Sequence, residues 1–461
     1  MAEKTRFHFT GICGTAMGAV AAAMKQRGFT VTGSDAAVYP PMSDFLRNQG
    51  ITIAEGYKEE NIPADADVVI IGNAISRGNP EAEAALDRKL LYHSLPEVMK
   101  EFFLRGKRNL VVSGTHGKTT TSSMLASVLR DAGRDPGFMI GGLPKNLGCG
   151  AYFPDSEFNV LEGDEYDTAF FDKRSKFLHY LPDCVIINNI EFDHADIYNS
   201  LDEIKLTFKR LLNIVPRSGR AFINGDDHNS LEVAANAPCP VTSVGFAESC
   251  GLRIENVQYD EERSSFTLGG ISYSVRMTGE FNVRNAAMAA AAATFAGLSA
   301  EEVRAGLENF EGVARRQELK GEVNGIKVVD DFAHHPTAIR LAVQSLRQRY
   351  HGSRLWVLFE PRSNTTRRAV FQNELAEALA TADFAVIAAI PDLHKIPEND
   401  RLDPVKLSQD IAHMGGSCAY LPDIESIISE VKKEAKPGDV IAVLSNGGFG
   451  GIHGKLLAAL A

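Results

Sequence analysis

The most constraining feature of the sequence is a glycine-rich loop between an apolar strand and a helix. Residues 111–121 read Val-Val-Ser-Gly-Thr-His-Gly-Lys-Thr-Thr-Thr, and a helix is expected from Ser122. Backbone N–H groups of such a loop point at phosphate oxygens, and the helix N-terminus adds partial positive charge. The usual motif has glycine where Val112 stands, so this loop is a shorter variant. The alternative, a chance Gly-Lys-Thr turn, fits the flanking strand and helix less well.

This loop predicts a nucleotide-phosphate site with a bound Mg²⁺. Lys118 would bridge the terminal phosphates, and the Thr119 hydroxyl would reach the metal. Two acidic stretches follow strand patterns, Glu162 after 159–161 and Asp193-His194 after 184–187. Ligands of parallel sheets bind beyond the carboxyl ends of the strands, and carboxylates suit Mg²⁺. His194 is an unusual Mg²⁺ ligand, so ligation and a supporting hydrogen bond both stay open. The expected metal ligands are Thr119, Glu162 and His194.

The first segment predicts a second nucleotide site. A strand at Arg6–Thr10 is followed by a loop at Gly11–Gly18, a helix at Ala19–Gln26 and a second strand that ends near Asp35. An acid at that place is typical of ribose binding. The strict G-x-G-x-x-G pattern fails because Cys13 and Ala16 replace two glycines, so a dinucleotide is disfavoured. A purely structural glycine turn is the alternative.

Two motifs near the carboxyl end also follow strand patterns. Asp330-Asp331-Phe-Ala-His334-His335-Pro336 could touch a nucleotide, although a histidine before a helix-starting proline is often part of a helix cap. Phe359-Glu-Pro-Arg-Ser-Asn-Thr contains Arg362, which suits a substrate carboxylate because arginine binds carboxylates through two parallel hydrogen bonds. A structural or ATP-side role for Arg362 is the alternative.

Length and composition bound the other possibilities. The 461 residues suggest about three domains, and alternating strand and helix patterns predict three α/β units with parallel sheets. The formal net charge of −11 disfavours nucleic-acid and anionic-membrane partners. No apolar run is long enough for a membrane helix, and the start lacks a signal peptide, so we expect a cytoplasmic protein. The six cysteines show no metal or redox spacing and are expected to be reduced.

Taken together, the motifs resemble those of the Mur ligase family, over nearly the whole chain. The motifs that carry the resemblance are Gly-Ile-Cys-Gly-Thr-Ala-Met-Gly, Gly-Thr-His-Gly-Lys-Thr-Thr-Thr, Asp193-His194, Asn282-Val-Arg-Asn285-Ala, Arg315-Arg316 and Asp330-Asp331-Phe-Ala-His-His-Pro. The resemblance implies a Rossmann-like UDP-binding domain (1–105), a central P-loop ATPase domain (106–314) and a Rossmann-like carboxyl-terminal domain (315–461). It also implies an ATP-dependent ligase that joins a carboxylate to an amine through an acyl phosphate.

The resemblance assigns roles to residues. Lys118, Glu162 and His194 would be catalytic. ATP would contact Gly114, Thr115, His116, Gly117, Lys118, Thr119, Thr120, Asn285, Arg316, Asp331 and His334. The UDP-sugar would contact Gly11, Cys13, Gly14, Thr15, Ala16, Ser34 and Asp35. The peptide would contact Arg362, Ser363, Asn364 and Thr365. Lys209 lies near the place where some members carry a carbamylated lysine, and an ordinary helix lysine is the alternative.

Within the family, the sequence is similar to the murein peptide ligases. These attach the tripeptide L-alanyl-γ-D-glutamyl-meso-diaminopimelate to UDP-N-acetylmuramate. The similarity rests on residues 39–42, 165–177, 188–197 and 359–365. The alternative is the branch that adds L-alanine to UDP-N-acetylmuramate. Two other classes are weighed: a P-loop switch or motor, which would not need the flanking domains, and a non-catalytic UDP-sugar sensor, which intact Lys118, Glu162 and His194 oppose.

Overall fold

The computed structural model describes residues 5–195 and 197–461. The chain divides into two compact units. The first unit comprises residues up to Ile190 together with Asp202–Arg253 and Ala287–Leu307. The second comprises Glu191–Leu201, Ile254–Ala286 and Glu308–Ala461. No helix within the described residues is long and apolar enough to cross a membrane.

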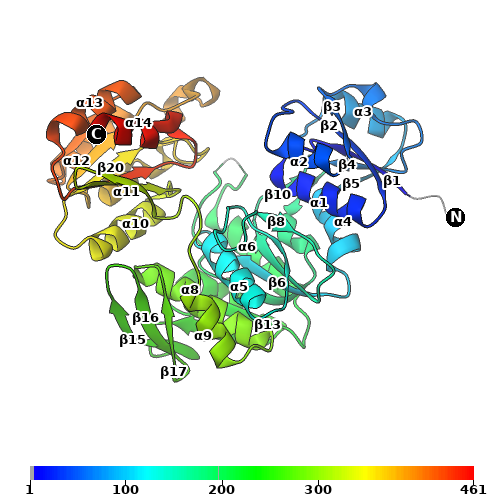
Figure 1. The fold of residues 1–461 in the computed structure, drawn as a ribbon, viewed down its shortest axis with the longest axis horizontal. Helices are drawn as coiled ribbons and strands as arrows, with labels where there is room; N and C mark the ends of the chain where they lie inside the picture. Colours follow the sequence, from blue (N-terminus) through cyan, green and yellow to red (C-terminus); the bar gives the residue numbers. More distant parts are fainter. Residues whose placement is uncertain (1–4, 196) are drawn as a thin grey trace. The chain divides into compact units, whose positions relative to one another are not determined.

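The amino-terminal part of the first unit is a five-stranded parallel sheet (Figure 1). Its strand order is β3 (Thr52–Glu55), β2 (Thr30–Asp35), β1 (Arg6–Thr10), β4 (Val68–Ile71) and β5 (Leu91–Ser94). The connecting helices are α1 (Thr15–Gln26), α2 (Met42–Asn48) and α3 (Pro80–Asp87).

Helix α1 begins earlier than the sequence pattern predicts. The loop expected at Gly11–Gly18 ends at Gly14, which caps the helix in an extended conformation. The Gly18 N–H already donates to the Gly14 carbonyl at 2.8 Å. A Cβ at Gly18 would lie 2.5 Å from the sulfur of Met42. This glycine therefore serves close packing of α1 against α2, and it does not mark a turn.

The second sheet of the first unit carries the glycine-rich loop after β6 (Arg108–Ser113). The strands run in the order β14 (Val241–Gly245), β13 (Arg220–Asn224), β12 (Pro182–Ile187), β6, β9 (Phe158–Gly163), β7 (Gly137–Met139) and β8 (Ala151–Tyr152). All neighbours are parallel except β7 and β8. The helices are α5 (Lys118–Asp131), α6 (Leu201–Asn213), α7 (His228–Ala234) and α9 (Ala300–Glu308), with α8 (Glu280–Phe295) entering from the second unit.

One expectation on this part needs correction. Helix α5 begins at Lys118 instead of Ser122, because Gly117 caps it in the left-handed region at φ +80°. The stretch before β6 contains α4 (Leu95–Met99) and a π-helical turn (Lys100–Leu104), and Phe103 and Leu104 are buried.

The second unit contains an antiparallel meander and a six-stranded sheet. The meander consists of β15 (Leu252–Tyr259), β16 (Ser264–Leu268) and β17 (Ile271–Val275). The first two residues of β15 belong to the first unit and pair in parallel with β14. The sheet order is β18 (Glu318–Val323), β19 (Ile326–Asp331), β23 (Val440–Leu444), β20 (Leu355–Phe359), β21 (Phe384–Ile387) and β22 (Cys418–Tyr420). Only β18 is antiparallel to its neighbour.

Five helices accompany this sheet: α10 (Pro336–Arg349), α11 (Gln372–Leu379), α12 (Pro404–His413), α13 (Ile424–Glu434) and α14 (Ile452–Leu460). Two separate cores form around it. One contains α10, α11 and α12 residues such as Leu346 and Leu375. The other contains α13 and α14 residues such as Val431 and Leu456. Since successive strand residues point to opposite faces, helices cover both faces of the sheet.

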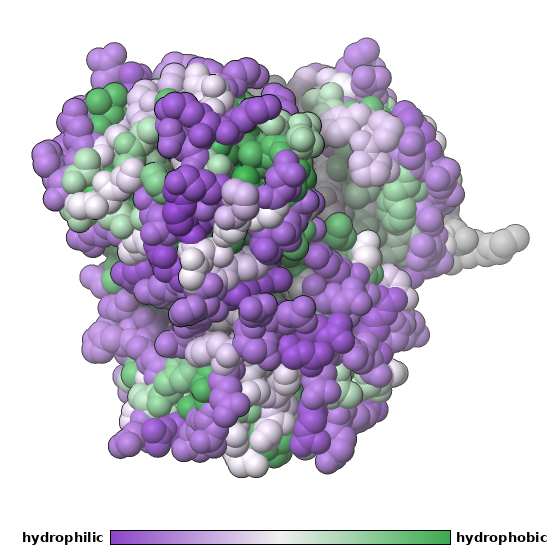
Figure 2. Space-filling view, turned by 60° about the vertical axis from the view of Figure 1, so that its left-hand side comes forward, coloured by the Kyte–Doolittle hydropathy of each residue, from purple (hydrophilic) through white to green (hydrophobic). Residues whose placement is uncertain are grey.

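The molecular surface seen in Figure 2 is predominantly hydrophilic, with apolar residues in small groups. This agrees with an ordinary globular composition, in which 44% of the residues are hydrophobic and 23% charged.

Candidate active site

The glycine-rich loop is held by two asparagines that follow β12. Gly114 has φ +124°, and a Cβ there would lie 2.9 Å from the Asn188 backbone nitrogen, so only glycine fits. The Thr115 N–H donates to the Asn189 carbonyl at 2.9 Å, and the His116 N–H donates to the Asn189 side chain at 2.8 Å. The loop amides of Thr115 and His116 are thus used within the protein. The amides of Lys118, Thr119 and Thr120 lie in the first turn of α5, where N–H groups have no acceptor in their own helix and phosphate is typically bound.

Lys118 lies in a strongly acidic environment. Its Nζ donates to the Gly114 carbonyl at 2.8 Å and contacts the buried Glu165 carboxylate at 3.1 Å. Asp164 lies 3.9 Å away. Burial alone would lower the pKa of Lys118, but the charges of Glu165, Asp164 and Glu162 outweigh it and raise the pKa above its usual range. Lys118 is therefore cationic at any physiological pH.

Glu162 is held at both oxygens by groups of the first unit. The Thr119 hydroxyl donates to Oε1 at 2.8 Å, and the Gly141 N–H donates to Oε2 at 2.6 Å. Burial and the neighbouring Asp164 raise the pKa of Glu162. A buried carboxylate that is repelled by a second acid is stabilised by a divalent cation, and these oxygen donors fit Mg²⁺. The structure thus brings together Thr119 and Glu162, two of the three expected metal ligands. The third, His194, belongs to the second unit.

The sequence did not assign roles to Glu165 or Gly141. Glu165 stands in the acidic run after β9, so the run itself was the available signal. Gly141 lies outside any motif, and only the three-dimensional structure reveals its bond to Glu162.

The amino-terminal loop is closed by Asp35 at the end of β2. The Cys13 N–H donates to Asp35 Oδ2 at 2.8 Å, and the Ala37 N–H donates to Oδ1 at 3.0 Å. The Gly11 N–H donates to the Ser34 carbonyl at 2.9 Å. Gly14 caps α1, while Thr15 and Ala16 form its first turn, so the expected UDP-sugar residues gather at the carboxyl ends of β1 and β2.

Beneath this loop lies a buried carboxylate that no motif signals. Glu81 of α3 is fully buried and accepts hydrogen bonds from Thr10 at 2.8 Å, Ser34 at 2.5 Å and Asn61 at 2.7 Å. His8 contacts the same carboxylate at 3.3 Å. Burial would raise the pKa of Glu81, but these hydrogen bonds outweigh it and lower the pKa.

In the second unit, Asp193 links the Asp-His motif to the segment after β20. Its Oδ1 accepts hydrogen bonds from the His194 N–H at 2.7 Å and the Thr365 hydroxyl at 2.9 Å. Burial would raise the pKa of Asp193, but the charges of His194, His335 and His334 lower it far below its usual value. Asp193 is therefore an anionic anchor for this corner of the unit.

The other members of the expected peptide segment also have partners. The Ser363 hydroxyl lies 2.7 Å from the Thr366 hydroxyl, and the Asn364 side chain accepts from Arg367 at 2.6 Å. Arg362 lies 3.7 Å from Glu360 and is 48% exposed, so its guanidinium remains accessible to a ligand.

Four expected ATP residues belong to the second unit, and two of them, Asp331 and His334, directly precede α10. Asp331 accepts from the Gln317 N–H at 2.9 Å and the Ala333 N–H at 2.7 Å, and burial raises its pKa. Arg316 lies over the Phe332 ring at 4.9 Å, and His334 contacts the Phe332 carbonyl at 3.0 Å. Asn285 of α8 donates to Asn282 at 3.5 Å. Lys209 is an exposed residue of α6, 3.9 Å from Glu232.

Comparisons with known proteins identify the family of the chain. The model of the Mur ligase family catalytic domain matches residues 6–107, that of the Mur ligase middle domain matches 112–293, and that of the Mur ligase glutamate ligase domain matches 315–447. The chain is 41% identical to the UDP-N-acetylmuramate–L-alanyl-γ-D-glutamyl-meso-2,6-diaminoheptanedioate ligase of Escherichia coli K12, covering 99% of this chain and 98% of that protein. The chain belongs to the Mur ligase family. The three-domain α/β architecture expected from the motifs is thereby confirmed.

Two further members of the Mur ligase family show which branch is nearer. A murein peptide ligase structure from Psychrobacter arcticus 273-4 is 36% identical with a TM-score of 0.71, covering 99% of this chain and 98% of that one. A UDP-N-acetylmuramate–L-alanine ligase from Desulforapulum autotrophicum is 31% identical, covering 100% of this chain and 99% of that protein. The L-alanine branch is thus the more distant one. The boundaries at 105/106 and 314/315 and the roles of single residues stay predictions.

Proposed function

We propose that this Mur ligase joins UDP-N-acetylmuramate to the tripeptide L-alanyl-γ-D-glutamyl-meso-diaminopimelate at the expense of ATP. The observation that supports this proposal is a full-length identity of 41% to a ligase named for this tripeptide, compared with 31% to a UDP-N-acetylmuramate–L-alanine ligase. The product is an amide, as expected of this family. The reaction places the protein in the reuse of cell-wall peptides, in the cytoplasm, with small molecules as its partners.

The reaction needs charge neutralisation at the phosphate. The lactyl carboxylate attacks the γ-phosphate of ATP and forms an acyl phosphate and ADP, and both reactants are anionic. Lys118 and the first amides of α5 would face the transferring group and stabilise its charge. Before ATP binds, Lys118 is paired with Glu165, so its ammonium must turn from that carboxylate or be shared with it.

Mg²⁺ would be held by Thr119 and Glu162, with His194 as the third expected ligand, and would neutralise phosphate oxygens when bound. Thr119 and Glu162 already contact one another. Gly141 orients the second oxygen of Glu162, which leaves the carboxylate little freedom to turn away.

The second half of the reaction is attack of the tripeptide α-amine on the acyl carbonyl, which releases phosphate. The amine must be neutral, so a proton acceptor is needed. His194 in its non-ligating role, or a nearby carboxylate, would accept this proton, because an imidazole bound to the metal has no lone pair left for it. The Asp193 carboxylate lies 4.0 Å from His194 Nδ1 and is anionic at neutral pH.

Substrate choice tests this function directly. Phosphate release is measured with UDP-N-acetylmuramate, MgATP and either the tripeptide or L-alanine. We expect kcat/KM for the tripeptide to exceed that for L-alanine by at least about a hundredfold, since a site with buried polar groups rejects ligands that leave them unpaired. A preference for L-alanine would replace the proposal with the alternative function. ATP hydrolysis that needs neither amine would point to a switch or motor.

A further inference from the structure

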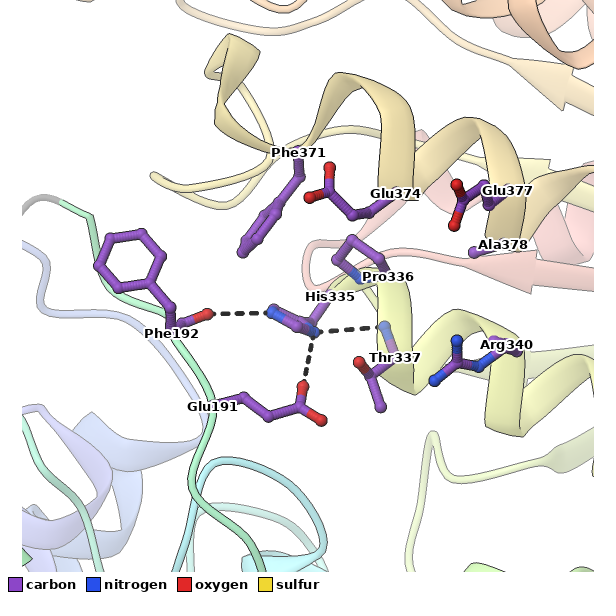
Figure 3. Close-up of a pocket in the computed structure, with 10 residues that line it drawn as sticks. All are labelled: Glu191, Phe192, His335, Pro336, Thr337, Arg340, Phe371, Glu374, Glu377 and Ala378. Atoms are coloured by element: carbon purple, nitrogen blue, oxygen red, sulfur yellow. Dashed lines mark hydrogen bonds and ion pairs between the residues drawn. The ribbon is translucent and has the colours of Figure 1, made fainter. Parts of the chain in front are cut away.

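A cavity of about 250 Å³ lies in the second unit between the amino-terminal part of α10 and helix α11 (Figure 3). Residues 191–192 form a third wall. His335 and Pro336 belong to the motif 330–336, and the other lining residues belong to none of the predicted sites. The cavity is large enough for an amino-acid-sized group, because a single water occupies about 30 Å³ in liquid water.

The inner wall of the cavity is rigid. The Thr337 N–H donates to Nδ1 of the buried His335 at 3.3 Å, and the Nε2 of His335 lies 3.1 Å from the Phe192 carbonyl oxygen. The imidazole also packs edge-on against Phe371, with ring centroids 4.7 Å apart. These contacts connect the start of α10 with residues 191–192, so the cavity is built into the fold.

Opposite charges line the cavity without neutralising one another. Arg340 projects from α10, while Glu374 and Glu377 project from α11, and Figure 3 shows the two sets on opposite sides of the opening. Within the described residues, none of these three side chains has an ion-pair or hydrogen-bond partner. A third carboxylate, Glu191, lies 3.6 Å from His335 Nδ1. Arg340, Glu374 and Glu377 are solvent-exposed, and their charges of both signs around one hollow suit a ligand that carries both signs.

The charge pattern excludes simpler ligands. Three carboxylates oppose a phosphate or a lone carboxylate, and Arg340 opposes a lone metal ion or amine. A zwitterionic α-aminocarboxylate satisfies both sets, with its carboxylate on the guanidinium and its ammonium between the glutamates. We propose that this cavity binds the free α-aminocarboxylate at the far end of the diaminopimelate residue. This inference rests on the function proposed above and names the residues that read the peptide's last amino acid.

The position of the cavity agrees with that role. Glu191 and Phe192 directly precede Asp193 and His194, and Asp193 contacts Thr365. The cavity therefore adjoins the corner of the same unit that holds the proposed proton acceptor. Three extended residues span about 10 Å. The last residue of a tripeptide can therefore lie about that far from the amine that reacts.

Two peptides that differ in one group test the assignment. The L-lysine analogue of the tripeptide keeps the distal amine but lacks the distal carboxylate. For the wild type, we expect KM to be at least about tenfold lower with the diaminopimelate peptide, the usual effect of one charge-assisted hydrogen bond. Arg340→Met should raise KM for the diaminopimelate peptide to the lysine-peptide value, with KM for ATP unchanged.

The remaining variants change the two glutamates of α11 and, as a control, another arginine of α10. Glu374→Gln combined with Glu377→Gln should raise KM for both peptides by a similar factor and leave their ratio intact. Arg347→Met is the matched control, because Arg347 lies on the same helix but donates to the Thr381 carbonyl. An unchanged peptide ratio in Arg340→Met, or an effect on ATP alone, would overturn the assignment.

Calorimetric binding of both peptides, with ADP and UDP-N-acetylmuramate present, separates the two proposals. If the wild type ligates the tripeptide but Arg340→Met binds it as tightly as the wild type, the cavity assignment alone is refuted. If the wild type binds the tripeptide more tightly than Arg340→Met does but does not ligate it, the proposed function alone is refuted. Absence of both binding and ligation refutes both.

Discussion

At the scale of single residues, the charge of Lys118 decides how the nucleotide site works. Three carboxylates surround it, and one of them, Glu165, is almost fully buried. The lysine is therefore compensated before ligand binds, and its loss would leave uncompensated negative charge where ATP phosphates must enter. A buried charge without its partner is strongly unfavourable.

We expect Lys118→Ala to reduce ligation at least about a hundredfold, because it removes one preorganised charge from the transferring phosphate. Phosphate release gives the rate, and circular dichroism checks that the fold is kept. Lys173→Ala is the control, since Lys173 pairs with Asp167 on an exposed hairpin. Near-normal turnover in a folded Lys118→Ala enzyme would remove Lys118 from the mechanism.

The metal ligands make a second prediction at this scale. Glu162→Ala and His194→Ala should each raise the Mg²⁺ concentration for half-maximal rate at least about tenfold, because even groups outside the metal's direct shell have effects of that size. Rates are measured over a Mg²⁺ titration at saturating ATP. Asp260→Asn, in the exposed β15–β16 turn, is the control. A wild-type Mg²⁺ response in both variants contradicts the metal assignment.

At the scale of elements, the structure places each predicted motif where a parallel strand ends, as the motifs led us to expect. They did not predict where helices begin. Gly14 and Gly117 cap α1 and α5, and both helices therefore start about one turn before their apolar pattern does. Nor could they predict contacts between distant segments, such as Glu81 with Thr10 and Ser34 or Gly141 with Glu162, since local patterns carry no information on pairing.

The segment 360–365 makes the first element-scale prediction. Since Thr365, Ser363 and Asn364 are engaged with protein groups, Arg362 is the member best placed to bind a peptide carboxylate. Arg362→Ala should raise the tripeptide KM at least about tenfold, with little change for ATP. Each substrate is varied separately. A selective rise for ATP, or no change for either substrate, removes Arg362 from the peptide site.

The second element-scale prediction concerns Glu81 and the side chains that donate to it, Thr10, Ser34 and Asn61. Glu81 connects β1, β2 and α3, so Glu81→Gln should lower the free energy of unfolding at pH 7 by about 1.5–3 kcal/mol, the value of a charge-assisted hydrogen bond. Because the folded-state pKa is lowered, this stabilisation is present above the ordinary pKa and is lost as pH falls through the folded value. Urea unfolding at pH 7 and at acidic pH measures it.

Glu83→Gln is the matched control on the same helix. Glu83 is paired with Arg77 at the surface, where water screens the pair, so its effect should be much smaller. A difference between wild type and Glu81→Gln that does not shrink at acidic pH would contradict the role of the ionised carboxylate.

At the scale of the whole molecule, the alternation of strands and helices predicted the architecture that the family comparison confirms. The chain nevertheless returns to each compact unit more than once, since residues 191–201 and 254–286 belong with the carboxyl-terminal part. Such a division depends on tertiary contacts, and a linear pattern of strands and helices cannot reveal it.

The six cysteines report on the integrity of the whole fold. All are free, Cys184 and Cys239 are buried, and burial raises the pKa of both. The thiolate is the reactive form, so these two should react with a thiol reagent at pH 8 only as fast as the protein unfolds. Burial and Asp35 also raise the pKa of Cys13, and UDP-N-acetylmuramate should shield it further if its loop binds that ligand.

Thiol titration with and without guanidinium checks this prediction. The slow class consists of Cys184 and Cys239, and it should lose one thiol in the Cys184→Ala variant. All six thiols should titrate in denaturant without reductant, and the slow class should follow the unfolding rate measured by circular dichroism. A count below six would reveal a disulfide. Rapid labelling of Cys184 in the native enzyme would show that the sheet around β12 opens without global unfolding, because Cys184 has no exposed surface in the folded chain.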